Sequence, residues 1–137
     1  MIRWLRSLGG NKEAPLTGSP EVRRQKTYSA QSGYVYQYVY DGHRAASRDN
    51  REGTQYVFDA SSDRKTSFPV SVFLSDDAVA AWERSHRRAL VDNERYAVAK
   101  MALFAAFDER ENPEAMHAEV PVDPAAVDAI LASLDID

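Results

Sequence analysis

Four tyrosines that alternate with other residues are the first side chains in the sequence that suggest a binding function. They are Tyr34, Tyr36, Tyr38 and Tyr40. In a regular β-strand, residues spaced by two project from one face, so the four rings would form a row. Such a row offers a contact area with polar tips to a protein partner, and aromatic rows also stack nucleic-acid bases. A third interpretation is that helices cover the rings and bury them as core. The sequence leaves these three interpretations open.

Positive side chains lie on both sides of the tyrosine row. The segment 41–53 carries Arg44, Arg48 and Arg51, and we expect it to be an exposed, mobile hairpin loop. The residues of interest in the N-terminal arm are Arg3, Trp4, Arg6, Arg23, Arg24 and Lys26. Together, the tyrosines, the arginine loop and the arm predict one surface that binds a protein partner or a second copy of this chain.

Signatures of catalysis are missing from the sequence. It has no Gly-x-Ser-x-Gly elbow, no glycine-rich phosphate loop, no dinucleotide fingerprint and no cysteine. One acidic cluster falls at the expected end of a helix, where carboxylates are least favourable and normally solvated. Its members are Asp108, Glu109, Glu111 and Glu114. We therefore expect a non-enzymatic protein that uses no cofactor.

Metal binding is also not predicted. Glu83 and His86 are spaced by three on an expected helix, as in di-metal carboxylate sites, but such sites need a second copy of the motif and further glutamates. The other histidines, His43 and His117, belong to different elements. His86 is explained more simply as a residue of an amphipathic helix.

The order of elements over 70–110 provides a second functional hypothesis. A strand over 70–74 leads directly into helices over 76–110, and this order resembles that of ribbon-helix-helix repressors. The resemblance covers about forty residues and implies a dimeric DNA-binding regulator whose paired strands enter the major groove. The outward positions of the strand would be Ser67, Pro69, Ser71 and Phe73. None of these is basic, as guanine recognition would require.

Charge is distributed unevenly over the 137 residues, whose formal net charge is −4. Residues 1–30 hold six Lys or Arg and two Asp or Glu, whereas residues 76–137 hold six and fourteen. An acidic body argues against sequence-independent binding of nucleic acid. Residues 1–8 place Ile2, Leu5 and Leu8 on one helical stripe, which suits a frayed terminus or a peripheral membrane contact. Since no apolar run is long enough to span a bilayer and cysteine is absent, we expect a cytoplasmic location.

Hydrophobic patterning predicts an α+β fold with one domain over 34–137, preceded by a flexible basic arm and linker over 1–33. Strands are expected over 34–40, 54–60 and 66–74 as an antiparallel meander, with a short fourth strand over 119–122. Two to three helices should pack on this sheet. Their predicted caps are Ser75, then Asp92 or Asn93, and finally Asp123 followed by Pro124. The middle helix is apolar nearly all round from Ala97 to Phe107, which predicts a central core element.

Overall fold

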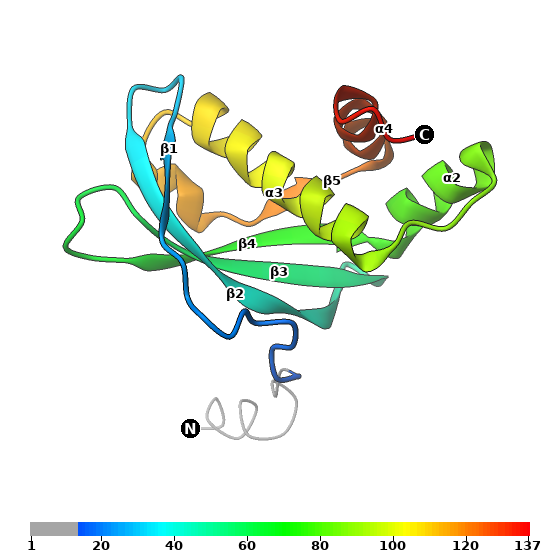
Figure 1. Ribbon diagram of the computed structural model, residues 1–137, viewed down its shortest axis with the longest axis horizontal. Coiled ribbons are helices and arrows are strands. Elements are labelled where there is room, and N and C mark those ends of the chain that lie inside the picture. The colour runs from blue at the N-terminus through cyan, green and yellow to red at the C-terminus, as the bar shows by residue number, and fades with distance from the viewer. Residues whose placement is uncertain (1–13) are drawn as a thin grey trace.

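The computed structural model describes residues 14–137, and over that range it shows an α+β fold with one curved sheet and three α-helices (Figure 1). The strands are β1 (Lys26–Ser29), β2 (Val35–Arg48), β3 (Arg51–Ser61), β4 (Phe68–Ser75) and β5 (Val120–Val122). The helices are α2 (Asp76–His86), α3 (Asp92–Glu109) and α4 (Pro124–Ser133), with a short 3₁₀ helix η1 (Pro113–His117). The predicted fold class is confirmed.

The sheet is larger than predicted and is mixed. The strands lie in the order β1-β2-β3-β4-β5, with antiparallel pairing from β1 to β4. The last strand, β5, pairs parallel to β4, with Val72 opposite Val120. A parallel partner needs a long crossover connection, which α2, α3 and η1 supply. The expectation of three or four antiparallel strands is therefore correct for the meander but incomplete.

The predicted mobile loop over 41–53 is wrong. β2 continues to Arg48, and β3 begins at Arg51, so only Asp49 and Asn50 form the turn. Both turn residues have positive φ, 51° and 66°, as in the type I′ turns that match the twist of a β-hairpin. Arg44 and Arg48 are consequently strand residues with fixed register rather than members of a flexible loop.

Part of the predicted linker over 1–33 also belongs to the sheet. Lys26–Ser29 pairs with β2 as its outer neighbour, with Lys26 opposite Tyr38. Further along the same edge of β2, Thr17 forms an isolated antiparallel bridge with His43. The residues from 14 to the start of β1 therefore lie against β2. The predicted terminal turn over 1–8, with Arg3, Trp4 and Arg6, lies outside the described residues.

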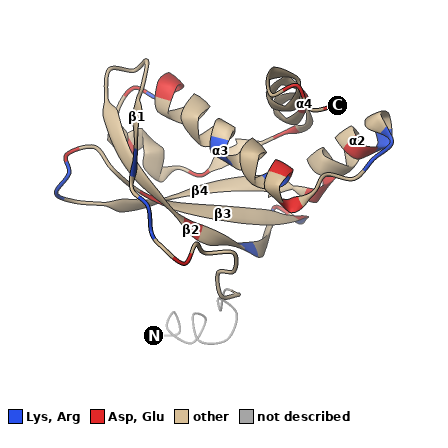
Figure 2. Ribbon diagram, viewed as in Figure 1, with Lys and Arg blue, Asp and Glu red and all other residues tan. Residues whose placement is uncertain are grey.

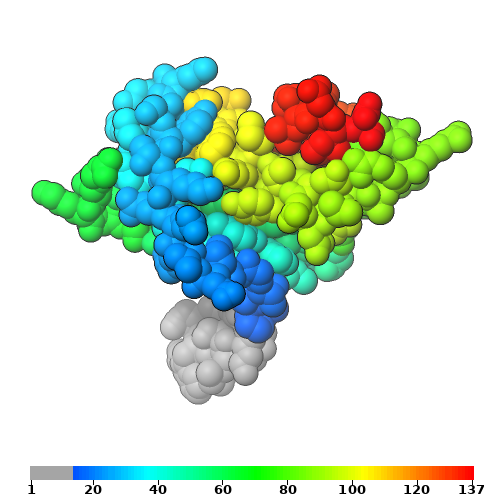
Figure 3. Space-filling model, in the orientation of Figure 1, coloured from blue at the N-terminus to red at the C-terminus, as the bar shows by residue number. Residues whose placement is uncertain are grey.

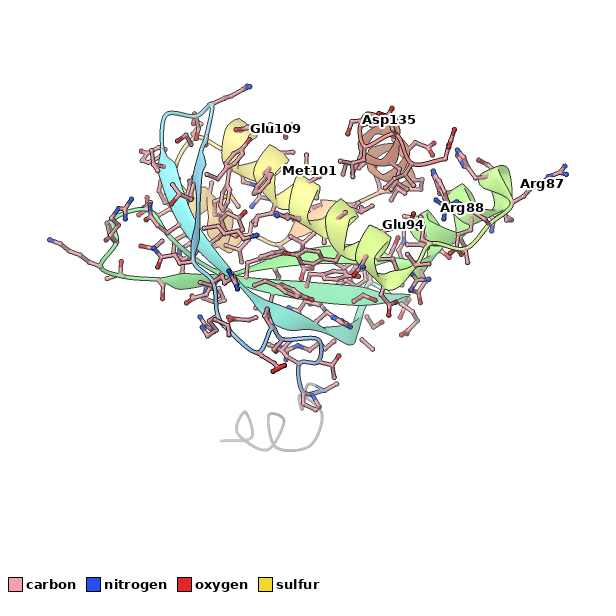
Figure 4. The ribbon with its side chains drawn as sticks, in the orientation of Figure 1. Arg87, Arg88, Glu94, Met101, Glu109 and Asp135 are labelled. Carbon is pink, nitrogen blue, oxygen red and sulfur yellow. The ribbon has the colours of Figure 1, made fainter. Side chains whose placement is uncertain are left out.

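Local capping signals explain most of the helix boundaries. The Ser75 hydroxyl accepts a hydrogen bond from the amide of Ala78, and the Asp123 carboxylate accepts one from the amide of Ala126, as predicted. The cap predicted for α3 is wrong. Its N-cap is Val91, whose amide donates to the Glu94 carboxylate at 3.0 Å. Glu94 also binds Arg88 through two hydrogen bonds of 3.0 and 2.9 Å, and this pair closes the α2–α3 connection (Figure 4).

α3 forms the centre of the core, as predicted. It lies along the concave face of the sheet, with α4 beside it, and its side chains Val98, Leu103 and Phe107 have no exposed surface (Figure 1). Burial is one-sided, however, because Ala105 on the outer side of the helix is exposed and Met101 is half-buried. The apolar run therefore belongs to a helix that is buried on the side facing the sheet and partly open on the other.

The resemblance to ribbon-helix-helix repressors does not extend to the topology. In that fold the strand pairs with its counterpart in a second copy of the chain. Here β4 is hydrogen-bonded to β3 on one side and to β5 on the other. The strand over 70–74 therefore has no free edge along Val72–Leu74 that a second copy could occupy.

Candidate functional site

The tyrosine row of β2 faces α3 and lies largely inside the protein. The exposed fraction of the residue is 0% for Tyr36 and 5% for Tyr38, whereas Tyr40 is half-buried and Tyr34 is 38% exposed. The Tyr36 ring stacks on Phe107, and the Tyr38 ring contacts Phe104 edge to face. Of the three interpretations of this row, coverage by helices describes Tyr36 and Tyr38. Tyr40 is left at the border of the core.

A β-bulge separates the tyrosines from the arginines of the same strand. Tyr40 lies opposite Phe58 and Gly42 lies opposite Val57, so Asp41 is an extra residue. The bulge shifts the residues that face α3 from even to odd numbers, because side chains alternate along a strand. His43 therefore shares the inner face with Tyr40, and Arg44 and Arg48 point to the outer face.

The structure does not bring the predicted arginines together with the tyrosines. Arg48 forms two hydrogen bonds with the carboxylate of Glu119, at 2.8 and 3.0 Å, and its guanidinium lies 5.4 Å from the centre of the Phe73 ring. Arg44 donates to the carbonyl of Ala14 at 3.4 Å. Arg51 is exposed at the start of β3. The three arginines thus belong to the hairpin and its outer face.

The basic residues just before β1 and at its first position divide between the two faces of the sheet. The Arg23 guanidinium binds the carboxylate of Asp41 and lies 3.6 Å from the carboxylate of Asp59. Arg24 and Lys26 instead line a cavity on the opposite side. This alternation follows from the extended conformation, in which successive side chains point in opposite directions. Tyrosines and arm residues therefore do meet, but inside a concavity.

This cavity has a volume of about 670 Å³ and lies between the segment 18–26, the inner face of β2 and β3, and the first turns of α3. In Figure 3, atoms of the strands are visible between the N-terminal segment, in blue, and α3, in yellow-green. Its lining comprises Gly18, Pro20, Glu21, Val22, Arg24, Lys26, Tyr38, Tyr40, His43, Thr54, Tyr56, Asp92, Asn93, Arg95 and Tyr96. We call it the tyrosine cavity because four of these residues are tyrosines.

Three of the four tyrosine rings of the cavity, those of Tyr40, Tyr56 and Tyr96, lie next to one another. The ring centre of Tyr40 lies 4.7 Å from that of Tyr96 and 6.5 Å from that of Tyr56. Burial raises the pKa of Tyr56 to about 12, and burial likewise raises the pKa of Tyr40 and Tyr96 above the ordinary value. The hydroxyls are therefore neutral at physiological pH, and the cavity offers flat aromatic walls with hydrogen-bonding tips.

His43 fastens the N-terminal segment at the edge of the cavity. Its Nδ1 lies 3.0 Å from the Tyr40 hydroxyl, and its Nε2 lies 3.4 Å from the Thr17 hydroxyl. The backbones of His43 and Thr17 exchange two hydrogen bonds of 2.8 and 2.9 Å. Gly18 follows with a φ of 73°, and a Cβ there would lie 2.7 Å from the His43 ring. A larger residue at position 18 would therefore displace either the segment or the imidazole.

Sequence reasoning missed His43, Tyr56 and Tyr96 as members of one site. The available signal was the Asp41-Gly42 pair inside the tyrosine strand, because glycine within a strand often marks a bulge. Recognising that bulge would have placed His43 on the tyrosine face. Nothing in the sequence pattern places Tyr96, which comes from α3.

Groups that could bind a metal do not converge within residues 14–137, where no three His, Asp or Glu side chains are suitably placed. His86 stacks on Trp82, with ring centres 4.1 Å apart, and its Nδ1 lies 3.0 Å from the Trp82 carbonyl oxygen. None of the helices in the described range has the length and apolarity required to cross a lipid bilayer.

Comparison with known proteins gives no match. No family model fits the chain, and neither curated proteins nor solved structures show significant similarity to it.

Proposed function

We propose that this chain is a non-enzymatic binding protein that holds a small organic ligand in the tyrosine cavity. The observation that carries this proposal is the cavity itself, with about 670 Å³ of space and four tyrosine rings in its lining. Small-molecule sites commonly enclose roughly 300–1,000 Å³ and combine aromatic walls with a few polar groups. A cytoplasmic site of action, expected from the cysteine-free sequence, is part of the proposal.

A small ligand agrees better with the burial of the tyrosines than the protein partner that we expected from the sequence. Tyr36 and Tyr38 are covered by α3, so the aromatic area of β2 that remains open to a ligand lies in the cavity. A protein face needs a broad and accessible surface, of about 800 Å² on each partner in a standard interface. A concave site of this size takes a compact molecule instead.

Binding without catalysis is supported by the hydrogen bonds of His43 and by the neutral state of the tyrosine phenols in the cavity. Both ring nitrogens of His43 lie near hydroxyls of the protein, those of Tyr40 and Thr17. A general base needs a nitrogen directed at the substrate proton. The phenols of Tyr40 and Tyr56, with their raised pKa values, are neutral and lack the charge of a phenolate nucleophile. In this arrangement the imidazole holds the N-terminal segment in place.

The test uses N-phenylnaphthylamine, a neutral aromatic probe whose fluorescence rises in apolar sites. We expect saturable binding of one probe to the full chain. Tyr96→Ala removes one wall of the cavity from a half-buried helix position, and Val22→Trp fills the mouth from a residue that is 62% exposed. Each substitution should weaken probe binding about tenfold, the equivalent of 1.4 kcal/mol.

The matched control is Tyr34→Ala. Tyr34 is an exposed tyrosine just before β2, and it does not line the cavity. This variant should bind the probe like the unmodified chain. Far-ultraviolet circular dichroism establishes that each variant is folded. The proposal fails if the folded chain shows no saturable binding, or if Tyr96→Ala and Val22→Trp bind as tightly as Tyr34→Ala.

A further inference from the structure

We infer that the ligand of the tyrosine cavity is an organic anion, with one acidic group attached to an aromatic or otherwise planar apolar body. The inference rests on the proposed function and adds the chemical class of the ligand. It follows from two cations of the cavity lining, Arg24 and Lys26, and from Lys100, which lies next to Lys26 outside the lining.

The cations come from two elements that face each other. Lys26 in β1 and Arg24 just before it line the cavity. Lys100 lies outside this lining, on α3, with its ammonium 5.8 Å from the centre of the Phe104 ring. The two elements are in contact, since the rings of Tyr28 in β1 and Phe104 in α3 stack with centres 4.2 Å apart. Figure 2 shows basic positions both on the chain leading into β1 and on α3.

Lys26 and Lys100 lie close enough to repel each other. Burial, followed by the charge of Lys26, lowers the pKa of Lys100 below its ordinary value. Protein carboxylates do not compensate for this repulsion: within residues 14–137, none lies within ion-pair distance of Arg24, Lys26 or Lys100. An anion between the two ammonium groups would remove the repulsion and replace the lost solvation.

Cationic side chains outnumber carboxylates in the lining of the cavity. Glu21 and Asp92 are the two carboxylates in the lining, and Asp92 lies at the first turn of α3, two turns before Lys100. Arg95 also lines the cavity, and at Tyr56 its charge, which lowers the phenol pKa, acts more strongly than that of Asp92, which raises it. The lining therefore holds three Lys or Arg side chains, Arg24, Lys26 and Arg95, and two of them lie at the start of β1. A ligand would place its acid at the lysines and its planar body among the rings.

The first experiment compares two probes that share one aromatic body. Anilinonaphthalene sulfonate carries a negative charge, and N-phenylnaphthylamine is its neutral counterpart. The variants are Lys26→Met, at an exposed position, and Lys100→Met, which replaces a half-buried cation by an apolar chain of similar length. Each should weaken sulfonate binding about tenfold, as expected when one charge-assisted hydrogen bond is lost, and should change binding of the neutral probe less than about twofold.

Lys65→Met is the matched control, because Lys65 is an exposed lysine on the β3–β4 connection that lines a different groove. It should leave both affinities unchanged. Lys100→Arg should retain sulfonate binding, since it preserves the charge. The inference is overturned if sulfonate and neutral probe keep the same affinity ratio in all these variants. Absence of binding by both probes contradicts the proposed function itself, so the two failures are distinguishable.

Competition experiments then separate the possible sources of the negative charge. Naphthoate and naphthyl phosphate are added to the chain with bound anilinonaphthalene sulfonate, with naphthyl methyl ether as the neutral competitor. Stronger displacement by naphthoate identifies a carboxylate site, and stronger displacement by naphthyl phosphate identifies a phosphate site. Equal displacement by all three competitors contradicts a requirement for charge.

Discussion

The ring of Tyr36 lies parallel to that of Phe107, with ring centres 4.0 Å apart and an angle of 9° between the planes. Neither side chain has any exposed surface. The stack joins the start of β2 to the end of α3 and fixes how the helix crosses the sheet. A tyrosine that the sequence offers as a binding residue is therefore a core residue at this position.

Tyr36→Phe should stabilise the protein. The Tyr36 hydroxyl is buried and has no hydrogen-bond partner among residues 14–137. Its removal keeps the ring stack and eliminates an unpaired polar group, so we expect the free energy of unfolding in urea to rise by about 1 kcal/mol. Tyr36→Ser, which deletes the ring, should lower it by about 3–5 kcal/mol. The control is Tyr28→Phe, which loses a 2.8 Å hydrogen bond to Asp108 and should lower stability. A destabilised Tyr36→Phe would contradict this account of the hydroxyl.

Arg48→Lys should weaken the link between the β2–β3 hairpin and Glu119, the residue just before β5. Lysine cannot reproduce the two parallel hydrogen bonds from Arg48 to Glu119. Because both side chains are partly exposed, solvent screening limits the expected loss to about 1 kcal/mol or less. A double-mutant cycle with Glu119→Gln, measured by urea unfolding, isolates the pair. A coupling energy of zero at low salt would show that this ion pair does not stabilise the fold.

Asp63→Asn should change the dependence of stability on pH. Hydrogen bonds from the amides of Thr66 and Lys65 and from the Thr66 hydroxyl hold the pKa of Asp63 well below its ordinary value. Because the pKa of Asp63 is lower in the folded state, its carboxylate stabilises the protein at pH values above 3.8, its pKa in the unfolded state. This stabilisation is lost as the pH falls through the pKa of the folded state. The Asp63→Asn variant should therefore be less stable than the unmodified chain at pH 7, and the difference in their free energies of unfolding should shrink below pH 3.8. Urea midpoints measured along the pH range provide the test, and a constant difference would contradict it.

Alkaline unfolding should accompany ionisation of the tyrosines. Burial raises the pKa of Tyr36, Tyr38, Tyr40, Tyr56 and Tyr96, to about 12 for Tyr56. When a tyrosine has a higher pKa in the folded state than in the unfolded state, it stabilises the protein fully at pH values below 10, the pKa in the unfolded state. This stabilisation is lost as the pH rises through the pKa of the folded state. Tyrosinate absorbance and circular dichroism should therefore change together between pH 10 and about 12. Ionisation of all seven tyrosines near pH 10 with unchanged dichroism would contradict this prediction.

Elements with local signals were predictable from the sequence. Ser75 and Asp123 cap their helices as expected, because a capping side chain binds an amide only three residues away. The second half of β2 was not predictable in this way. Arg48 looks like a loop residue until its carboxylate partner, Glu119, is known, and that partner lies 71 residues further along the chain.

The tyrosine cavity could be predicted only in fragments. The strand pattern identifies Tyr38, Tyr40 and Tyr56 as strand residues, but their meeting with Tyr96 depends on where α3 crosses the sheet. β1 was missed because its neighbours are typical linker residues and its four residues form an edge strand. Its pairing with β2 is decided by contacts such as the stack of Tyr28 on Phe104, which sequence periodicity does not encode.

The extra residue in β2 also decides which changes of chain length the strand tolerates. Deletion of Asp41 would join Tyr40 to Gly42 without a bulge and would keep His43 opposite Tyr56. The contacts of Asp41 with Arg23 and Ser19 would be lost. Deletion of Arg44 would instead turn every later side chain of the strand over, so that Arg48 pointed toward the helices. Asp41 is thus a position where β2 can lose one residue without exchanging its inner and outer faces.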